Sequence, residues 1–261
     1  MTKARHIENS AGPRRQLIFG VEVDALTMDE TVARVRELVR DGELHQHVVL
    51  NAAKVVEMAR NERLRRIIST CSLVNVDGSA VVWASWLLGR PVPSRVTGID
   101  LFERLAGVAA SDGHSIFLLG AQGPVVEQVS VVLQQRHPGL IVAGVLDGFW
   151  TDDEVVVETV RRSGATYLFL AVPSPKKEYW LNDHLQELGV PLVMGVGGAF
   201  DVVAGKTRRA PVVMQRLGLE WAWRLLLEPR RMWRRYLTGN TKFVLLTARE
   251  VWKTRRPGAH T

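Results

Sequence analysis

The sequence predicts an α/β fold, with a mainly parallel sheet, helices on both of its faces and a basic helical appendage at the C-terminal end. Three observations predict it. Short runs rich in Val, Ile and Leu recur along the chain, and few of them alternate with polar residues, as in strands buried on both faces. Segments of helical period lie between these runs. After Pro211 the strand-like runs stop and only helical patterns follow.

The apolar runs define the predicted sheet. Seven apolar runs are expected to form strands, at 17–23, 47–51, 73–77, 115–119, 140–145, 166–172 and 191–196. Ligands of such folds bind beyond the carboxyl ends of the strands. The residues that follow each run are therefore the places to search for a site.

The helical segments between the strands carry start signals. The first spans 28–39, with Thr27 as its N-cap, and similar patterns cover 101–110, 125–135, 152–162 and 176–188. Thr151 followed by Glu154 predicts a capping box. Two further helices are expected at 212–227 and 230–247, divided at Pro229. The predicted organisation is a flexible leader at 1–15, an α/β domain at 16–210 and a helical appendage at 211–255.

Composition and charge narrow the function classes. The chain has 261 residues, 46% of them hydrophobic, which suits a globular protein, and its one cysteine, Cys71, suits a reducing cytoplasm. Residues 206–256 hold 14 basic residues against three acidic ones, although the net charge of the whole chain is only +7. This basic segment indicates nucleic acid, anionic lipid or a phosphorylated substrate, or else a solvated helical face. Its interleaved tryptophans favour a membrane surface.

Polar residues stand at several predicted strand ends. Asn51 ends the second run and Asp77 the third, where a carboxylate followed by Gly78 can accept a proton or bind a hydroxyl. The alternative for Asp77 is that it only caps the next helix. Arg95 and Asp100 follow a proline-rich loop, and they either pair with each other or contact a ligand.

Glycines and lysines follow the later strands. Gly120 lies in a strand-to-helix turn that could approach a phosphate. Lys176 and Lys177, beside Glu178, start a helix against its dipole, which an anionic ligand would explain.

The glycine-rich segment from Gly195 to Asp201 includes Gly197 and Gly198, but Phe200 replaces the last glycine of a dinucleotide fingerprint, so we reject a nicotinamide site. The sequence has no Walker loop, no nucleophile elbow and no clustered metal ligands, and we expect no metal cofactor.

Taken in order, these segments resemble the WecG/TagA/CpsF glycosyltransferase family from about residue 17 to 250. The most specific stretch is GVGGAFDVVAGKTRRAP at 195–211, followed by QRLGLEW at 215–221 and RLLLEPRR at 224–231. The segments VDG at 76–78, RVTGIDL at 95–101 and PKKE at 175–178 fall in the expected order.

The resemblance implies a Rossmann-like body and an inverting transferase on the cytoplasmic face of the membrane. Such enzymes move an N-acetylmannosamine-type sugar from a UDP donor to a polyprenyl-diphosphate-linked sugar, for cell-surface polysaccharide or teichoic acid. By resemblance Asp77 is the catalytic base and Asn51 an active-site asparagine. The glycine-rich loop and residues 176–178 line the donor pocket, and three arginines of the appendage reach the donor diphosphate, namely Arg224, Arg230 and Arg231.

Two departures from the family pattern lie in the donor region. Val49-Leu50-Asn51 stands where the family often has Thr-Pro-Asn, and Lys177 stands where it often has Gln. The expected partners are a UDP-sugar, a lipid-linked acceptor and an anionic membrane surface, with no nucleic acid, and a homo-oligomer is left open. The rival readings are a basic nucleic-acid-binding protein and a non-catalytic membrane-associated protein.

Overall fold

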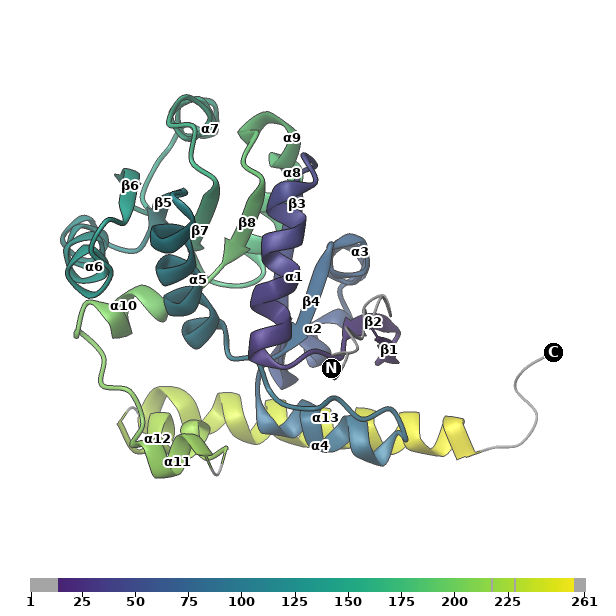
Figure 1. The fold of residues 1–261 in the computed structure, drawn as a ribbon. Helices are drawn as coiled ribbons and strands as arrows, with labels where there is room; N and C mark the ends of the chain where they lie inside the picture. The colour runs from purple at the N-terminus through teal and green to yellow at the C-terminus, as the bar shows by residue number, and fades with distance from the viewer. Residues whose placement is uncertain (1–13, 217, 228, 256–261) are drawn as a thin grey trace, which may run out of the picture.

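The fold is a six-stranded parallel sheet between layers of helices, with a separate two-stranded hairpin near the N-terminus (Figure 1). A computed structural model describes residues 14–216, 218–227 and 229–255. The parallel strands are β3 (His45–Leu50), β4 (Leu73–Val76), β5 (Ser115–Gly120), β6 (Ile141–Leu146), β7 (Tyr167–Ala171) and β8 (Leu192–Gly195). They lie in the order β4-β3-β8-β7-β5-β6, so β3 has β4 on one side and β8 on the other. The direction of winding reverses at this point, where ligand sites of open parallel sheets are found.

Six of the seven predicted strands are confirmed, and the first is wrong as a single strand. Residues 17–23 belong to an antiparallel hairpin of β1 (Arg15–Ile18) and β2 (Val21–Asp24). The chain reverses at Phe19 and Gly20, which both have positive φ, as a two-residue hairpin turn requires. Arg15 pairs with Asp24 at 3.2 Å, and regular structure begins at this residue, the last of the expected leader. Residues 1–13 lie outside the described part of the chain.

Helices cover both faces of the sheet, as predicted. On one face α1 (Met28–Arg40), α5 (Gly98–Asp112), α6 (Gly123–Arg136) and α10 (Ala199–Val203) pack on the sheet in one apolar cluster. On the other, α7 (Asp153–Arg162), α8 (Lys176–Asp183) and α9 (Leu185–Leu188) form a second. A third cluster joins β3, β4 and the hairpin to α2 (Ala52–Met58), α3 (Glu62–Thr70) and α4 (Ser79–Leu87). The sheet is thus buried on both faces, which explains its nearly unbroken apolar runs.

Local start signals decide where several helices begin. Thr27 and Glu30 form a complete capping box at α1, as expected for that N-cap. The expected box at Thr151 is wrong, because Asp152 is the N-cap of α7 and its carboxylate accepts from the backbone amides of Glu154 and Val155. The expected helix at 176–188 is divided at His184 into α8 and α9.

Four helices lie beneath the carboxyl edge of the sheet in the view of Figure 1, and we call them the basal layer. They are α4, α11 (Val212–Arg216), α12 (Glu220–Leu227) and α13 (Pro229–Arg255). Helix α13 starts at Pro229, where the sequence predicted the division. It packs along α2 and buries Phe243 in the third cluster, where the ring lies 5.6 Å from that of Phe19. Within the described residues, no helix is long and apolar enough to cross a bilayer.

Candidate active site at the carboxyl edge of the sheet

Asp77 stands directly after β4 at the edge where the sheet meets the basal layer. Its backbone amide donates to the carbonyl of Leu50 at the end of β3, with an N–O distance of 2.8 Å. The following helix, α4, has Gly78 as its N-cap with φ of 107° and no side-chain capping bond. The alternative that Asp77 caps the helix that follows it is therefore wrong. Its Oδ2 instead accepts from the Gly98 amide, at 3.4 Å.

The electrostatic surroundings of Asp77 suit a proton acceptor. Burial raises the pKa of its carboxyl group above the ordinary aspartate value, and the charge of Glu220 adds to this effect. The Gly98 amide and the charges of Arg95 and Lys54 oppose the rise only in part. A carboxylate with a raised pKa is a stronger base and holds a proton more readily when it takes one from a hydroxyl.

Asn51 directly follows β3, near Asp77, and its side chain caps the next helix. Its Oδ1 accepts from the Lys54 amide at 3.0 Å and caps α2. This cap places Lys54 on the inner side of α2, where its Nζ donates to the carbonyl of Val49 at 2.7 Å. Sequence reasoning missed Lys54; the available signal was a lone charge inside the apolar start of a helix.

A buried ion-pair cluster, formed by Lys54, Lys177 and Glu178, lies behind this edge. Lys54 Nζ is 2.8 Å and Lys177 Nζ 3.9 Å from Glu178 Oε1, and only 2% of the Glu178 side chain is exposed. Burial acts to raise the pKa of Glu178, but the two lysine charges outweigh it and hold the pKa below its ordinary value. Burial and the charge of Lys54 lower the pKa of Lys177 to about 8, against the opposing effect of Glu178 and Asp77.

The two lysines at the start of α8 therefore have different surroundings. Lys176 is exposed, whereas Lys177 is buried against Glu178. The burial of Lys177 is explained within the protein, because Glu178 and the nearby charge of Asp77 compensate its charge, and its contact with an anionic ligand stays a prediction. Lys176 remains available to an anionic ligand.

The glycine-rich loop makes room for Lys177. A Cβ on Gly195 would lie 2.7 Å from Lys177 Cδ, and one on Gly197 would lie 3.1 Å from its Nζ. Because these glycines have no side chain, the aliphatic part of Lys177 can pass over their backbone towards the carboxyl ends of the strands. Gly198 is exposed at the start of α10, and Asp201 on α10 pairs with Lys206 at 3.8 Å.

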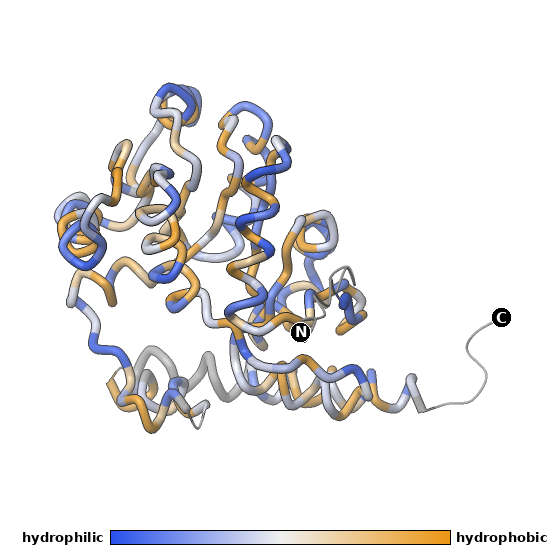
Figure 2. Tube along the Cα trace, in the orientation of Figure 1, coloured by the Kyte–Doolittle hydropathy of each residue, from blue (hydrophilic) through white to orange (hydrophobic). Residues whose placement is uncertain are grey.

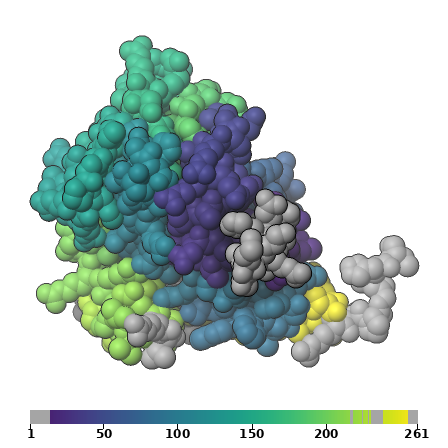
Figure 3. Space-filling model, viewed as in Figure 1, coloured from purple at the N-terminus to yellow at the C-terminus, as the bar shows by residue number. Residues whose placement is uncertain are grey.

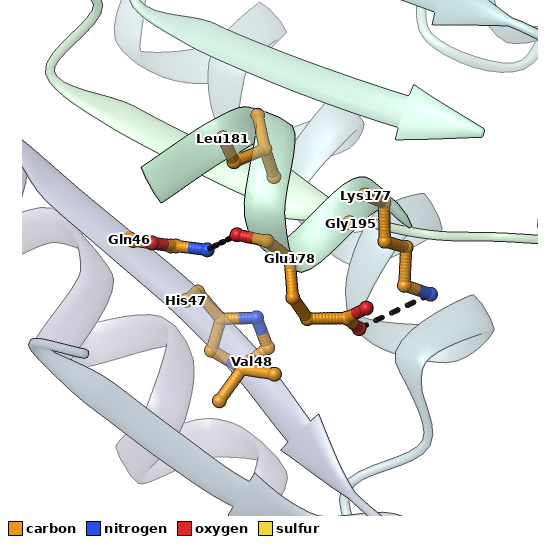
Figure 4. A pocket seen from close by; sticks show the side chains of 7 residues that line it. All are labelled: Gln46, His47, Val48, Lys177, Glu178, Leu181 and Gly195. Carbon is orange, nitrogen blue, oxygen red and sulfur yellow. Dashed lines mark hydrogen bonds and ion pairs between the residues drawn. The ribbon is translucent and has the colours of Figure 1, made fainter. Parts of the chain in front are cut away.

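The space around this cluster is tight. Figure 4 shows Glu178 between Lys177 and the β3 residues Gln46, His47 and Val48, with only a narrow gap among them. Gln46 Nε2 donates to the Glu178 carbonyl at 3.2 Å, and His47 is hydrogen-bonded to Asn75. The gap has no room for a water-sized sphere, so it supports the edge from within and is not a binding pocket.

Gly120, at the end of β5, is required by packing. It has φ of 113°, and a Cβ there would lie 2.6 Å from the Ala171 carbonyl oxygen. The close approach of β5 and β7 explains this glycine without a phosphate.

Arg95 and Asp100 do not pair with each other; each binds the C-terminal part of the chain. Arg95 donates to the Gln215 carbonyl at 2.5 Å and pairs with Glu220 at 3.4 Å. Asp100 accepts from the Thr97 hydroxyl and pairs with Arg209, both at 2.5 Å.

Gly218 lies against Ser79, two residues after Asp77: a Cβ on this glycine would lie 1.9 Å from Ser79 Oγ. Residues 209–216 and 218–220 thus pack against the segments next to Asp77. Sequence reasoning missed Arg209, Gln215, Gly218 and Glu220 because their partners lie more than a hundred residues away.

The three appendage arginines are placed only by their backbones. Arg224 lies in α12, and Arg230 and Arg231 lie in the first turn of α13. Their side chains lie outside what the structure describes, so their contact with a diphosphate stays a prediction. No group of three His, Cys, Asp or Glu side chains able to hold a metal ion occurs in the described part of the chain.

Comparison with known proteins fits this geometry. A family model described as "Glycosyl transferase WecG/TagA/CpsF family" matches residues 16–257. Among curated relatives, the N-acetylglucosaminyldiphosphoundecaprenol N-acetyl-beta-D-mannosaminyltransferase of Staphylococcus aureus strain NCTC 8325 is 30% identical over 233 residues, which cover 87% of this chain and 91% of the relative. The protein of the same name from strain MRSA252 matches at the same identity and coverage. The chain therefore belongs to the WecG/TagA/CpsF glycosyltransferase family.

Proposed function

We propose that the protein transfers N-acetylmannosamine from a UDP donor to an N-acetylglucosamine unit carried on a polyprenyl diphosphate. The activity for which the relatives are named supports the sugar and the lipid-linked acceptor. The observation that carries the proposal is Asp77, a partly buried carboxylate with a raised pKa at the carboxyl edge of the sheet, which makes no capping bond to the helix that follows it.

Asp77 acts as the general base in this proposal. Its carboxylate takes the proton of the acceptor hydroxyl as the hydroxyl oxygen forms a bond to the anomeric carbon of the donor sugar. The bond between that carbon and the UDP oxygen breaks at the same time, and UDP leaves with its bonding electrons. A single displacement from the opposite face inverts the anomeric configuration.

Positive groups at the same edge stabilise the leaving diphosphate. Lys176 is exposed at the start of α8, and the backbones of Arg224, Arg230 and Arg231 place these residues in the helices fastened over the edge. Guanidinium groups bind diphosphate oxygens in pairs, which lowers the energy of the charge that develops on departure. The proposed reaction therefore runs without a metal ion.

The proposed place of action is the inner face of the plasma membrane, where a polyprenyl-linked acceptor presents its sugar. The basic appendage supplies the attraction to anionic lipid. A nucleic-acid-binding protein could use the same positive charge, but that alternative does not explain the buried carboxylate of Asp77 at the carboxyl edge of the sheet.

UDP release by the purified protein tests the proposal. We expect release from UDP-N-acetylmannosamine only when an N-acetylglucosaminyl-diphospho-lipid is added, with UDP-N-acetylglucosamine as the control donor. Transfer of another sugar would overturn the donor assignment. Absence of UDP release from every donor, together with tight and salt-sensitive oligonucleotide binding, would instead favour the nucleic-acid alternative.

A further inference from the structure

The outward face of α4 is apolar although the helix lies at the surface. Trp83, Trp86 and Leu87 are 62%, 65% and 60% exposed. Their spacing places them on one side of the helix, opposite the buried Val81 and Ala84. Figure 3 shows α4, in blue, on the lower surface of the molecule. Three large side chains on one helical face form a patch of the kind that marks an interaction surface.

Helix α13, which packs in the same apolar cluster as α4, also exposes an apolar side chain near positive charge. Its Phe243 packs in the same apolar cluster as Val81 of α4, so both helices turn their other faces away from one core. Leu245 is 64% exposed, and Lys242 and Arg249 are exposed on the same side, three and four residues away. In Figure 2 hydrophobic residues recur along both of these helices of the basal layer.

The chemistry of this surface selects its occupant. Indole rings favour the boundary between lipid headgroups and acyl chains, and basic residues beside them are attracted to anionic headgroups. A protein partner would need no such excess of positive charge. Helix α4 also begins two residues after Asp77. A bilayer under α4 would therefore bring lipid headgroups to the edge of the sheet that carries the proposed base.

We propose that α4 is a membrane-inserting helix: Trp83, Trp86 and Leu87 enter the interfacial region of an anionic phospholipid bilayer, with the basic face of α13 beside them. This inference rests on the proposed function, since it explains how a lipid-linked acceptor reaches Asp77. In this inference α4, which belongs to the α/β domain, supplies the main apolar contact with the bilayer. The basic residues of the appendage supply the electrostatic attraction.

Site-specific labelling tests the insertion directly. The one cysteine, Cys71, is buried, so a cysteine introduced at Leu87 can be labelled alone with a polarity-sensitive dye. With the full chain and vesicles of phosphatidylglycerol and phosphatidylcholine, we expect a blue-shifted, brighter emission from Leu87→Cys. The matched control is Val155→Cys on α7, 61% exposed and on the opposite side of the molecule, which should not respond (Figure 1). Equal responses at the two positions would overturn the proposal.

A partition measurement adds the energetic test. Trp83→Ser/Trp86→Ser should lower the vesicle partition coefficient by about tenfold or more, whereas Val155→Ser should leave it unchanged. Lys242→Ala/Arg249→Ala should weaken binding to anionic vesicles only. Wild-type partitioning by the double tryptophan variant, with the fold verified by circular dichroism, would overturn the insertion. A Leu87 label that responds to protein concentration without lipid would also overturn it, because the face would then join two copies of the chain.

Transfer to a soluble, short-chain acceptor separates this inference from the proposed function. The double tryptophan variant should turn over this acceptor at the wild-type rate. If the wild type transfers no sugar to any acceptor but its Leu87 label still enters the bilayer, the proposed function fails and the docking surface stands. If sugar is transferred but the label stays in water, only the docking surface fails.

Discussion

The carboxyl edge of the sheet and the basal layer beneath it invert the usual distribution of polarity. At the edge, Lys54, Lys177 and Glu178 are buried in a compact ion-pair cluster behind Asp77. In the basal layer, α4 and α13 leave tryptophan and leucine side chains exposed. Burying charge and exposing apolar surface both reduce the stability gained on folding.

The difference shows what each region is adapted to. The edge holds charge where a leaving diphosphate and a proton acceptor need it, and the surrounding strands and helices fix its geometry. The layer has an outward face suited to a medium other than water. Contacts that join the two regions include those of Arg95 with Gln215 and Glu220, and the packing of Phe243 in the third cluster. Substitutions in either region can test this difference.

The largest effect on stability is expected in the layer. Phe243→Ala removes the ring that attaches α13 to the core, and a buried Phe→Ala change costs about 3–5 kcal/mol. Chemical unfolding should show this loss, while Val244→Ala, at an exposed neighbour, should stay within about 0.5 kcal/mol of the wild type. Equal stabilities for the two variants would mean that α13 is not part of the folded core.

Breaking the buried pair at the edge should cost somewhat less. Lys54→Met leaves Glu178 buried with only the more distant Lys177, and the free energy of unfolding should fall by about 3 kcal/mol. The control is Lys206→Met, which breaks the exposed pair with Asp201 and should cost at most about 1 kcal/mol. A loss for Lys54→Met no greater than that of the control would contradict the assigned importance of the cluster.

Lys177→Gln should change the pH profile more than the fold. The charge of Asp77 raises the pKa of Lys177, so by reciprocity the ammonium group holds the pKa of Asp77 down. Without it, the acid limb of kcat/KM should move to higher pH. Any loss of rate near pH 8, where Lys177 gives up its proton, should disappear. Lys176→Gln, at the exposed neighbour, should leave both limbs in place, and an identical profile for Lys177→Gln would uncouple the cluster from the base.

The smallest expected effect is that of chelation. The proposed stabilisation of UDP relies on arginine and lysine, so EDTA should leave the rate of UDP release unchanged. Loss of activity in EDTA, with recovery on addition of magnesium or manganese, would show that a metal ion is required.

The sheet could be predicted from the sequence because five of its strands are largely buried and the sixth, β6 at the edge, is still composed of apolar residues. Each of the six parallel strands therefore reads as an apolar run, whatever its neighbours in the sheet. The hairpin was missed for the opposite reason. Its two strands are short, and a turn at Phe19 and Gly20 is concealed within a run of apolar residues.

The site was predictable only where a single position carries the signal. Asp77 follows a strand and precedes a glycine, so its place at the edge could be predicted from the sequence, although the structure was needed to show that it does not cap α4. The partners of Arg95 and Asp100 could not be read, because Gln215 and Arg209 reach them through the fold. Lys177 was expected to bind a ligand, whereas its burial depends on Lys54 and Glu178 coming together from separate segments.

The rate of sugar transfer by Asp77→Asn tests the central claim most directly. Asparagine keeps the size of the side chain but cannot take the acceptor proton, and general-base catalysis contributes about 10²–10⁴-fold. We expect UDP release with the lipid-linked acceptor to fall by about that factor, while thermal unfolding stays close to that of the wild type. Release at the wild-type rate would show that Asp77 is not the base and would contradict the account.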